Sequence, residues 1–341
     1  MKAVVYDAPR AFAVRDVPIP EPGRGEIRFR VLLAGVCGTD RHIHDGTFFA
    51  RFPLTPGHEP VGIVDAVGDG VTTVEPGQRV TANGIGSCGA CAYCRRGEPL
   101  HCRNLTALGV TGPGAFAEYM IAPESGVFVV DDLEPEVAVF AEPTACAMHG
   151  AAQLAMRPGS TALLFGAGPT GLILAQLLAH GGAAHVAVAA PTEFKLELAR
   201  SFGIDETILV NRADPAASAA KILATHPDGF DVVVDATGSS RVTEECPQLA
   251  RDGGTILVYG VTDPADRIAV SPYEIYRREL TIKGSFAQSH SFDQAIAALR
   301  SGRVRTDGII NRRFTLEEFG AALDALSSDE AAHKVVIEPG R

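Results

Sequence analysis

Four of the chain's seven cysteines lie close together, and their spacing is that of a metal site. Two residues separate the first cysteine from the second and the second from the third, and seven residues separate the third from the fourth. Four thiolates so spaced can surround a zinc ion tetrahedrally, with no open position for a substrate. An iron–sulfur cluster is the competing interpretation, but ferredoxins continue with three residues and a Cys-Pro pair, whereas seven residues intervene here and Arg103 follows. The pattern predicts a structural zinc lobe over residues 84–104, held by Cys88, Cys91, Cys94 and Cys102.

A second set of donor side chains is spread over the first half of the chain. Cys37 follows a strand-like stretch, and His58 and Glu59 follow the turn at Pro56-Gly57. Glu142 lies farther along, where the pattern of the chain changes. A thiol, an imidazole and carboxylates form a mixed donor set that suits a zinc ion with an exchangeable position. Each residue also has an ordinary structural interpretation, as a core cysteine, a loop histidine or a charge at a helix N-terminus. Spacing alone leaves both interpretations open.

Residues 166–171 read Gly-Ala-Gly-Pro-Thr-Gly and fit the pattern G-x-G-x-x-G. The motif follows an apolar run and opens a helical pattern, which is the context in which it indicates dinucleotide binding. The first glycine permits a tight turn, the second lets the backbone approach a pyrophosphate, and the third packs the helix against the strand. A pyrophosphate would then lie at the helix N-terminus. The expected cofactor contacts are Gly166, Gly168, Pro169, Thr170 and Gly171.

The next strand lacks the acidic residue that binds the ribose 2′-hydroxyl of NAD. Its expected last residue is Ala190, and Pro191 and Thr192 follow it. Without a carboxylate there is no repulsion against a 2′-phosphate, which Thr192 and Lys195 are placed to contact. We therefore expect the chain to use NADP or NAD, with Glu193 as the alternative carboxylate.

The elements that must position these residues form two domains. Residues 1–152 contain short strands separated by Gly and Pro turns, as in an antiparallel barrel-like β domain. From 153 to 286, strands and helices alternate, which predicts a doubly wound parallel sheet. We assign the tail, 287–341, with two helices and a closing strand, to the first domain.

Three further residues fall at strand ends, where a nicotinamide ring is expected: Thr237, Gly238 and Val261.

Periodicity gives the bounds of these elements. The expected strands are 26–36, 61–67, 78–82, 115–122, 161–165, 185–190, 207–210, 230–237, 254–261, 280–286 and 334–338. The expected helices are 169–180, 192–202, 217–224, 241–249, 292–300 and 316–326.

Composition restricts the partners and the compartment. Acidic residues number 41 against 30 Lys and Arg, a net charge of −11, and no basic run occurs in the sequence. Nucleic acids and anionic membranes are therefore poor partners. The uncharged segment 158–192 is divided by its central glycines into two runs too short for a membrane span. Asp7 lies where a signal peptide would be apolar, so we expect a cytoplasmic protein.

Five motifs follow one another in one order over the whole chain: Cys37-Gly38-Thr39-Asp40, Gly57-His58-Glu59, the four-cysteine lobe, Glu142-Pro143 and the glycine motif. Together they resemble the zinc-containing medium-chain dehydrogenase/reductase family, and Glu142 is typical of its polyol (sorbitol-like) and sugar dehydrogenase branches. The resemblance implies a GroES-like β-barrel catalytic domain, a Rossmann domain, NADP or NAD, and two zinc ions per chain. One zinc would be catalytic and one structural. Family members are commonly dimers or tetramers, so a homo-oligomer is expected.

The same resemblance implies roles for the scattered donors. Cys37, His58 and Glu59 would be ligands of the catalytic zinc. Glu142 falls where some members place a fourth ligand or a residue that reaches zinc through water.

Three other positions match the family. Thr39 falls where a hydroxyl relays the proton of the alcohol, and His42 would continue this relay toward solvent. Lys195 matches a basic position that lines the adenosine pocket. A surface-loop histidine remains the ordinary interpretation of His42.

The activity implied is the interconversion of a secondary alcohol of a polyol or sugar-like substrate and the ketone, by hydride transfer with NAD(P). The loop 41–54 is expected to form a wall of the substrate cleft, because it mixes polar and aromatic residues. Ala287-Gln288 replace an Arg-Tyr pair common in sorbitol dehydrogenases, which argues against sorbitol itself. The alternatives are an L-threonine 3-dehydrogenase and a glucose dehydrogenase. A zinc-free quinone reductase-like or non-enzymatic cofactor-binding protein is a remote alternative.

Overall fold

The computed structural model describes residues 1–329 and 331–341, which divide into two compact units. Unit 1 comprises Met1–Pro143, Phe292–Arg300 and Thr306–Arg341, and unit 2 comprises Thr144–Ser291 and Ser301–Arg305. The chain first passes from unit 1 to unit 2 between Pro143 and Thr144, within helix α4 (Ala141–Leu154). The boundary expected from the sequence, at residue 152, lies in the same helix. No helix in the described part of the chain is long and apolar enough to span a membrane.

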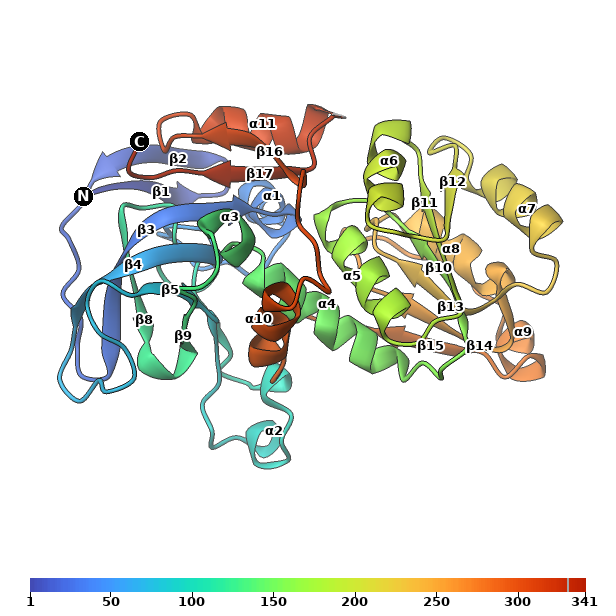
Figure 1. The fold of residues 1–341 in the computed structure, drawn as a ribbon, viewed down its shortest axis with the longest axis horizontal. Coiled ribbons are helices and arrows are strands. Elements are labelled where there is room, and N and C mark those ends of the chain that lie inside the picture. Colours follow the sequence, from blue (N-terminus) through green and yellow to red (C-terminus); the bar gives the residue numbers. More distant parts are fainter. Residues whose placement is uncertain (330) are drawn as a thin grey trace. The chain divides into compact units, whose positions relative to one another are not determined.

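Unit 1 is built on a mixed sheet (Figure 1). Its strands are β3 (Glu26–Val36), β4 (Glu59–Val67), β5 (Arg79–Ala82), β8 (Tyr119–Pro123), β9 (Val127–Val129), β16 (Ile310–Phe314) and β17 (Lys334–Ile337). They pair in the order β16-β17-β3-β4-β5-β9, and β8 pairs with the other end of β3. Among the strand pairs described for this sheet, β16–β17 is parallel and the others are antiparallel. The tail strand β17 therefore lies directly against β3, in the same unit as the first residues of the chain.

Shorter elements complete unit 1. They are β1 (Lys2–Ala8) and β2 (Ala11–Asp16), which form a hairpin, β6 (Ile85–Gly86), β7 (Thr106–Ala107), α1 (Gly38–Asp45), α2 (Ala92–Arg95), α3 (Pro135–Ala138), α10 (Phe292–Arg300), α11 (Phe319–Ser328) and the 3₁₀ turns Pro99–His101 and Glu124–Gly126. The core of the unit includes the fully buried rings of Tyr6, Phe116 and Phe319.

Unit 2 is a parallel sheet with connecting helices (Figure 1). Its strands are β10 (Thr161–Phe165), β11 (His185–Ala190), β12 (Glu206–Leu209), β13 (Phe230–Asp235), β14 (Ala250–Val258) and β15 (Thr281–Gly284). Its helices besides α4 are α5 (Pro169–His180), α6 (Glu193–Ser201), α7 (Pro215–Thr225), α8 (Ser240–Leu249) and α9 (Pro272–Arg277). The order β12-β11-β10-β13-β14-β15 winds outward in two directions from β10. Ligands of such sheets bind where the winding reverses, at the carboxyl ends of the strands.

Strong periodicity gave accurate bounds. The predictions for β3, β10, β11, α5 and α10 are confirmed residue for residue, and the other predicted strands and helices shift by a few residues. The sequence patterns predicted no element at the positions of β1, β2, β6, β7, β9, β16, α1, α2, α3, α4 and α9. The strand predicted at 115–122 begins only at Tyr119. Before it, the backbone N–H of Phe116 donates to the Pro56 carbonyl, and the Phe116 carbonyl accepts from the N–H of Val4. These bonds take the place of a regular strand ladder.

The expectation of a loop over 41–54 is wrong in its first part, because Arg41–Asp45 belong to helix α1. The Asp40 side chain accepts a hydrogen bond from the backbone N–H of Cys37, and the Cys37 sulfur accepts one from Thr39. This capping arrangement starts the helix, and Gly46, with φ of 76°, ends it. Cysteine is an unusual N-cap residue, so the pattern gave little warning of the helix.

Candidate active site

The register of two strands brings three donor side chains together. Gly35 of β3 pairs with Glu59, the first residue of β4, so Cys37, just past the end of β3, lies beside His58, just before β4. The donor atoms of Cys37, His58 and Glu59 all lie within 4.8 Å of one another. Glu142 lies outside this group, although its charge acts on His58 and on Lys334.

A buried carboxylate lies beside the histidine ring. Asp40 Oδ1 lies 3.7 Å from His58 Nδ1, and Asp40 Oδ2 accepts the backbone N–H of Cys37 at 2.9 Å. Burial raises the pKa of Asp40 to about 6, although the charge of His58 acts to lower this pKa. Burial alone would lower the pKa of His58, but Asp40, followed by Cys37, raises it well above its usual value. A carboxylate behind a histidine is the arrangement that orients metal-binding imidazoles.

The donor set fits a zinc ion. Asp40 Oδ1 and His58 Nδ1 are buried side-chain atoms without a hydrogen-bond partner among the described residues. Such atoms are costly unless something satisfies them, and a cation bound by the other ring nitrogen would leave Nδ1 protonated and able to donate to Asp40. A thiolate, an imidazole and a carboxylate are a donor set that zinc takes. Three protein ligands leave one position for a substrate.

Lys334 is a residue of this site that the sequence analysis missed. It is the first residue of β17, it is 3% exposed, and its Nζ forms an ion pair with Glu59 Oε2. Burial lowers the pKa of Lys334, but Glu59 and Cys37 outweigh burial and raise it. Lys334 therefore holds the Glu59 carboxylate at the donor group.

Gly35 was also missed, and it makes room for this ion pair. A Cβ atom at Gly35 would lie 1.9 Å from Glu59 Oε2 and 2.8 Å from Lys334 Cε. Gly35→Ala is therefore expected to displace Glu59 and to weaken zinc binding by about 10- to 100-fold. Zinc retained after dialysis against a graded chelator series measures this effect. Gly112→Ala is the matched control, because a Cβ there meets nothing within 4 Å. Equal zinc retention by the two variants would contradict this role of Gly35.

Thr39 and His42 occupy one side of helix α1, three residues apart. The ring Nδ1 of His42 lies 2.9 Å from Thr47 Oγ1, and the Thr47 hydroxyl also faces the backbone carbonyl of His42. The structure thus ties the His42 ring to Thr47, not to Thr39. A relay from Thr39 would have to enter His42 through the other ring nitrogen, Nε2.

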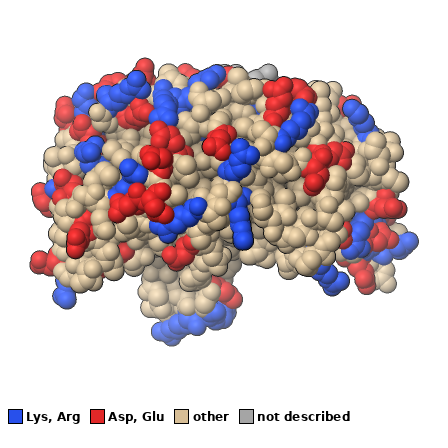
Figure 2. Space-filling model, in the orientation of Figure 1, with Lys and Arg blue, Asp and Glu red and all other residues tan. Residues whose placement is uncertain are grey.

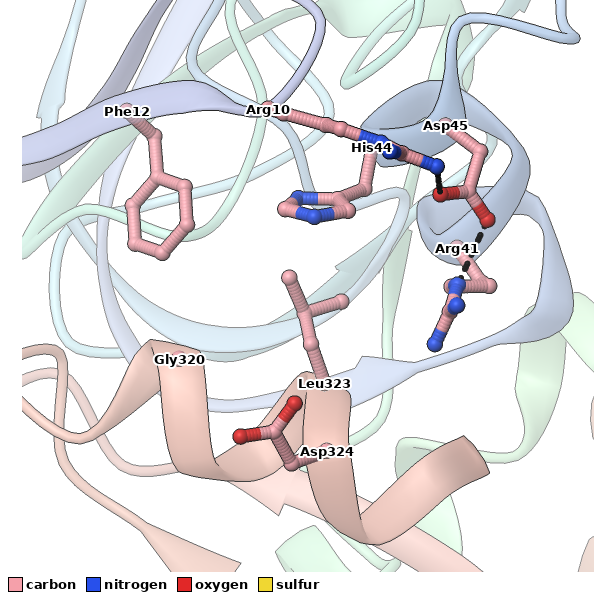
Figure 3. A pocket seen from close by; sticks show the side chains of 8 residues that line it. All are labelled: Arg10, Phe12, Arg41, His44, Asp45, Gly320, Leu323 and Asp324. Atoms are coloured by element: carbon pink, nitrogen blue, oxygen red, sulfur yellow. Dashed lines mark hydrogen bonds and ion pairs between the residues drawn. The ribbon is translucent and has the colours of Figure 1, made fainter. Parts of the chain in front are cut away.

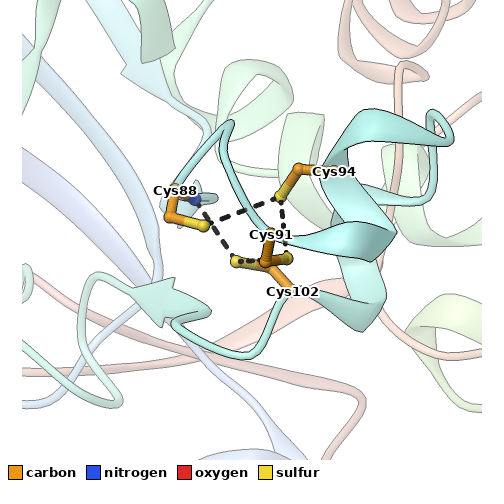
Figure 4. Close-up of side chains that lie close together, drawn as sticks. All are labelled: Cys88, Cys91, Cys94 and Cys102. Carbon is orange, nitrogen blue, oxygen red and sulfur yellow. Dashed lines mark hydrogen bonds between the residues drawn. The ribbon is translucent and has the colours of Figure 1, made fainter.

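The four lobe cysteines form a second donor group (Figure 4). Their sulfur atoms are 3.5 Å apart for Cys91–Cys94 and 4.0 Å apart for both Cys88–Cys94 and Cys91–Cys102. Zn–S bonds of about 2.3 Å place tetrahedral sulfurs about 3.8 Å apart, so these spacings fit zinc without rearrangement. Backbone N–H groups of Cys94 and Arg103 lower the pKa of Cys91 to about 6, which favours the thiolate that binds metal.

Charges are mixed over the visible face of the molecule (Figure 2). Basic side chains gather at the tip of the cysteine lobe, where Arg95, Arg96 and Arg103 are exposed, but Glu98 accompanies them and pairs with Arg96. This small basic cluster is confined to the lobe.

The glycine motif has the backbone geometry of a phosphate-binding turn. Gly166 has φ of 108°, and a Cβ at Gly171 would lie 2.1 Å from the carbonyl oxygen of Gly166. Gly168 is the N-cap residue of α5, and a Cβ there would meet nothing within 4 Å. The first and third glycines thus permit the turn and its packing, and the second leaves open space before the helix N-terminus. A pyrophosphate fits such a space.

A buried aspartate that the sequence analysis missed shapes the neighbouring strand end. Asp235, the fully buried last residue of β13, accepts hydrogen bonds from the backbone and hydroxyl of Thr237 and from the Thr243 hydroxyl. These bonds hold the turn at Gly238, whose Cβ position lies 2.3 Å from the carbonyl oxygen of Val261. Thr237, Gly238 and Val261 are therefore brought together.

The end of β11 has no carboxylate aimed at a ribose. Ala190 is buried, and Thr192 is the N-cap residue of α6. Glu193, the alternative carboxylate, forms an ion pair with Arg200 at 2.6 Å, within its own helix. Lys195 lies in the first turn of the same helix.

A separate cavity of about 460 Å³ lies between α1, α11 and the hairpin (Figure 3). Its lining residues are Arg10, Phe12, Arg41, His44, Asp45, Gly320, Leu323 and Asp324. Asp45 accepts hydrogen bonds from Arg10 and Arg41 at 2.9 and 2.6 Å. His44 and Asp45 belong to the segment 41–54 that was expected to form a wall of the substrate cleft, but they line a pocket whose lining includes none of the three donor residues.

Comparison with known proteins matches both units. The profile of the alcohol dehydrogenase GroES-like domain matches residues 23–132, and that of the zinc-binding dehydrogenases matches residues 169–301. D-arabinitol dehydrogenase 1 of Uromyces fabae is 43% identical over 99% of this chain and 97% of its own length. L-threonine 3-dehydrogenase of Anaeromyxobacter sp. strain Fw109-5 is 33% identical over the full length of both chains.

A solved structure agrees with these sequence matches. A protein from Sinorhizobium meliloti 1021, described as a zinc-binding dehydrogenase and bound to NADP, superimposes with a TM-score of 0.93. It is 33% identical, and the match covers 99% of each chain.

Proposed function

This chain belongs to the family of zinc-dependent alcohol dehydrogenases, and from this membership we propose that it oxidises a secondary alcohol of a polyol or sugar-like substrate to the ketone, or runs the reverse reaction. The convergence of Cys37, His58 and Glu59 carries the proposal, because this donor set leaves one position for a substrate oxygen. Similarity to a D-arabinitol dehydrogenase supports the polyol class.

Two zinc ions per chain are part of the proposal. Cys37, His58 and Glu59 would hold the catalytic ion, with Glu142 acting on the site through its charge or through water. The lobe cysteines would hold the structural ion. When bound, the catalytic zinc supplies Lewis acidity toward the substrate oxygen, and the nicotinamide supplies a hydride acceptor or donor.

The chain's own residues move the proton and bind the cofactor. Thr39 Oγ1 would accept the alcohol proton and pass it to His42 Nε2, since His42 Nδ1 is held by Thr47. The N-terminus of α5 would bind the pyrophosphate beside the open face of Gly168. The turn of Thr237 and Gly238, with Val261, would position the nicotinamide.

Initial rates at 340 nm with purified, zinc-replete protein test this function. The panel contains polyols, aldoses, L-threonine and simple alcohols, each with NAD and with NADP. We expect turnover on a five- or six-carbon polyol or sugar and about two zinc ions per chain by elemental analysis. Turnover restricted to simple alcohols, or cofactor reduction that survives zinc removal, would refute the proposal.

A threonine dehydrogenase is the second candidate, because an L-threonine 3-dehydrogenase matches the chain over its full length. A kcat/KM for L-threonine above that for every polyol in the panel would establish it. The same zinc centre and hydride transfer serve both substrates, so the substrate panel alone separates them.

Ala190→Asp is expected to shift the NADP/NAD ratio of kcat/KM at least about tenfold toward NAD, because a carboxylate at this strand end repels a 2′-phosphate and accepts a 2′-hydroxyl. Ala190→Asn is the matched control, with nearly the same size and no charge. An unchanged ratio in the aspartate variant would show that Ala190 does not lie at the ribose.

We also propose a homo-oligomer that works in a reducing compartment such as the cytoplasm. The free thiols of all seven cysteines suit reducing conditions. Ile282 on edge strand β15, Phe286 just beyond it and Tyr276 of α9 expose apolar surface that a second copy would cover. Sedimentation equilibrium measures the assembly, and a monomer at micromolar concentration would contradict this part of the proposal.

A further inference from the structure

A third group of metal-binding side chains lies in unit 2, apart from the residues assigned above. The donor atoms of His185, Glu206 and His226 all lie within 4.8 Å of one another. His185 begins β11, Glu206 begins β12, and His226 directly follows α7. Because β11 and β12 are parallel, their first residues share the edge of the sheet opposite to the strand ends assigned to the cofactor. The group therefore needs an explanation of its own.

Both rings converge on a single carboxylate oxygen. Glu206 Oε2 lies 2.9 Å from His185 Nε2 and 3.1 Å from His226 Nε2. Ligands bound to zinc at 2.0–2.2 Å in a tetrahedron lie about 3.3–3.5 Å apart, so an ion would need these atoms to separate by only a few tenths of an ångström. The rings stack with their centroids 6.1 Å apart.

Thr225 indicates which nitrogen of His226 carries a proton. The Thr225 hydroxyl donates to the backbone carbonyl of Ile222 at 3.0 Å, and its oxygen also lies 3.0 Å from His226 Nδ1. A hydroxyl has one proton to donate, so His226 Nδ1–H donates to Thr225. In a neutral ring the lone pair of Nε2 then faces Glu206 Oε2. That contact requires a positive centre, which is either a second proton or a metal ion.

We propose that His185, Glu206 and His226 form a third, zinc-class metal site, which links the starts of β11 and β12 to the end of α7. Two imidazoles and a carboxylate are a recurring zinc donor set that leaves a position for water. The hydrogen bond from His226 to Thr225 fixes the ring as outer contacts do in metal sites. Side-chain exposures of 33%, 32% and 23% give an ion access from solvent. The site is independent of the proposed oxidoreductase function.

Calorimetric titration tests the proposal. Untagged protein is loaded with zinc, freed of excess ion and analysed for its zinc content, and is then titrated with Zn²⁺ at pH 7.5. We expect one further equivalent to bind to the wild-type protein and none to the H185Q/H226Q double variant. The E206Q variant keeps both rings and a hydrogen-bond acceptor, and we expect its affinity for this equivalent to fall at least tenfold. H180Q is the matched control, because the His180 ring bonds to the Gln176 carbonyl of its own helix and belongs to none of the donor groups found among the described residues.

Thermal unfolding gives a second readout. Added Zn²⁺ should raise the Tm of the wild-type and H180Q proteins but not that of the double variant, and Mg²⁺ should raise none, since it prefers oxygen ligands. Equal total zinc, preloaded plus titrated, in the wild-type protein and in E206Q or the double variant would overturn the proposal and leave a protonated His–Glu–His cluster. Failure of the substrate panel would not change these differences between variants, so the two proposals are tested separately.

Discussion

Cys37→Ser is expected to lower kcat/KM about a thousandfold, because loss of the Lewis acid removes several kcal/mol of transition-state stabilisation and each 1.36 kcal/mol is a factor of ten. The thiolate is the only sulfur among the three donors that converge at this site. A serine hydroxyl is a poor substitute for it, because a soft thiolate ligand favours zinc. Initial rates with the best substrate of the panel, together with zinc content, measure the effect. We expect the variant to lose one zinc ion per chain and to keep the ion of the lobe.

Cys246→Ser is the matched control for this substitution. Cys246 is fully buried in unit 2, and its thiol donates to the Val242 carbonyl within α8, a bond that serine also forms. Its activity should stay within about twofold of the wild-type value, as for other near-isosteric changes. A Cys37→Ser variant that loses one zinc ion but keeps more than a tenth of the activity would show that this centre is not catalytic.

Much of the fold could be predicted because its strands and helices carry strong local patterns. Buried parallel strands such as β10 and β11 read as short apolar runs, and Gly166 marks the turn between β10 and α5. Helix α1 was missed because its N-cap is a cysteine, and the hairpin β1–β2 because Pro9-Arg10 between its strands is not one of the usual hairpin-turn pairs. These elements depend on their tertiary neighbours more than on local propensity.

The site residues likewise divide into those that the sequence predicts and those that only the structure reveals. Cys37, His58 and Glu59 could be proposed from their residue types and order, and the structure brings them together. Gly35 and Lys334 could not, because their roles depend on the pairing of β3 with β4 and β17. Lys334 lies about 275 residues from its partner, and in the sequence it resembles any charged residue at the start of a strand. Its burial and its ion pair with Glu59, which only the structure shows, place Lys334 at the donor group.

Lys334→Met is expected to destabilise the metal-free protein by about 3–5 kcal/mol, because it leaves the Glu59 carboxylate buried without its partner. Glu59 is 1% exposed, so water cannot replace the ammonium group. For a domain of this size the loss corresponds to a fall in Tm of roughly 10 °C. Thermal unfolding of protein stripped of metal measures it. Reloading with zinc should recover part of the stability, since an ion held by Cys37, His58 and Glu59 neutralises the same carboxylate.

The double variant Glu59→Gln/Lys334→Met separates the ion pair from the packing of the lysine stem. With the carboxylate removed, the methionine no longer leaves a charge unpaired, so the double variant should be more stable than Lys334→Met alone. Lys283→Met is the matched control, because Lys283 Nζ donates to the Gln153 carbonyl and not to a carboxylate. Its loss should cost only about 0.5–1.5 kcal/mol, as for an ordinary hydrogen bond. If Lys334→Met costs no more than Lys283→Met, the buried ion pair does not hold Glu59. In that case zinc binding alone would have to position the carboxylate, and Lys334→Met would leave zinc affinity unchanged.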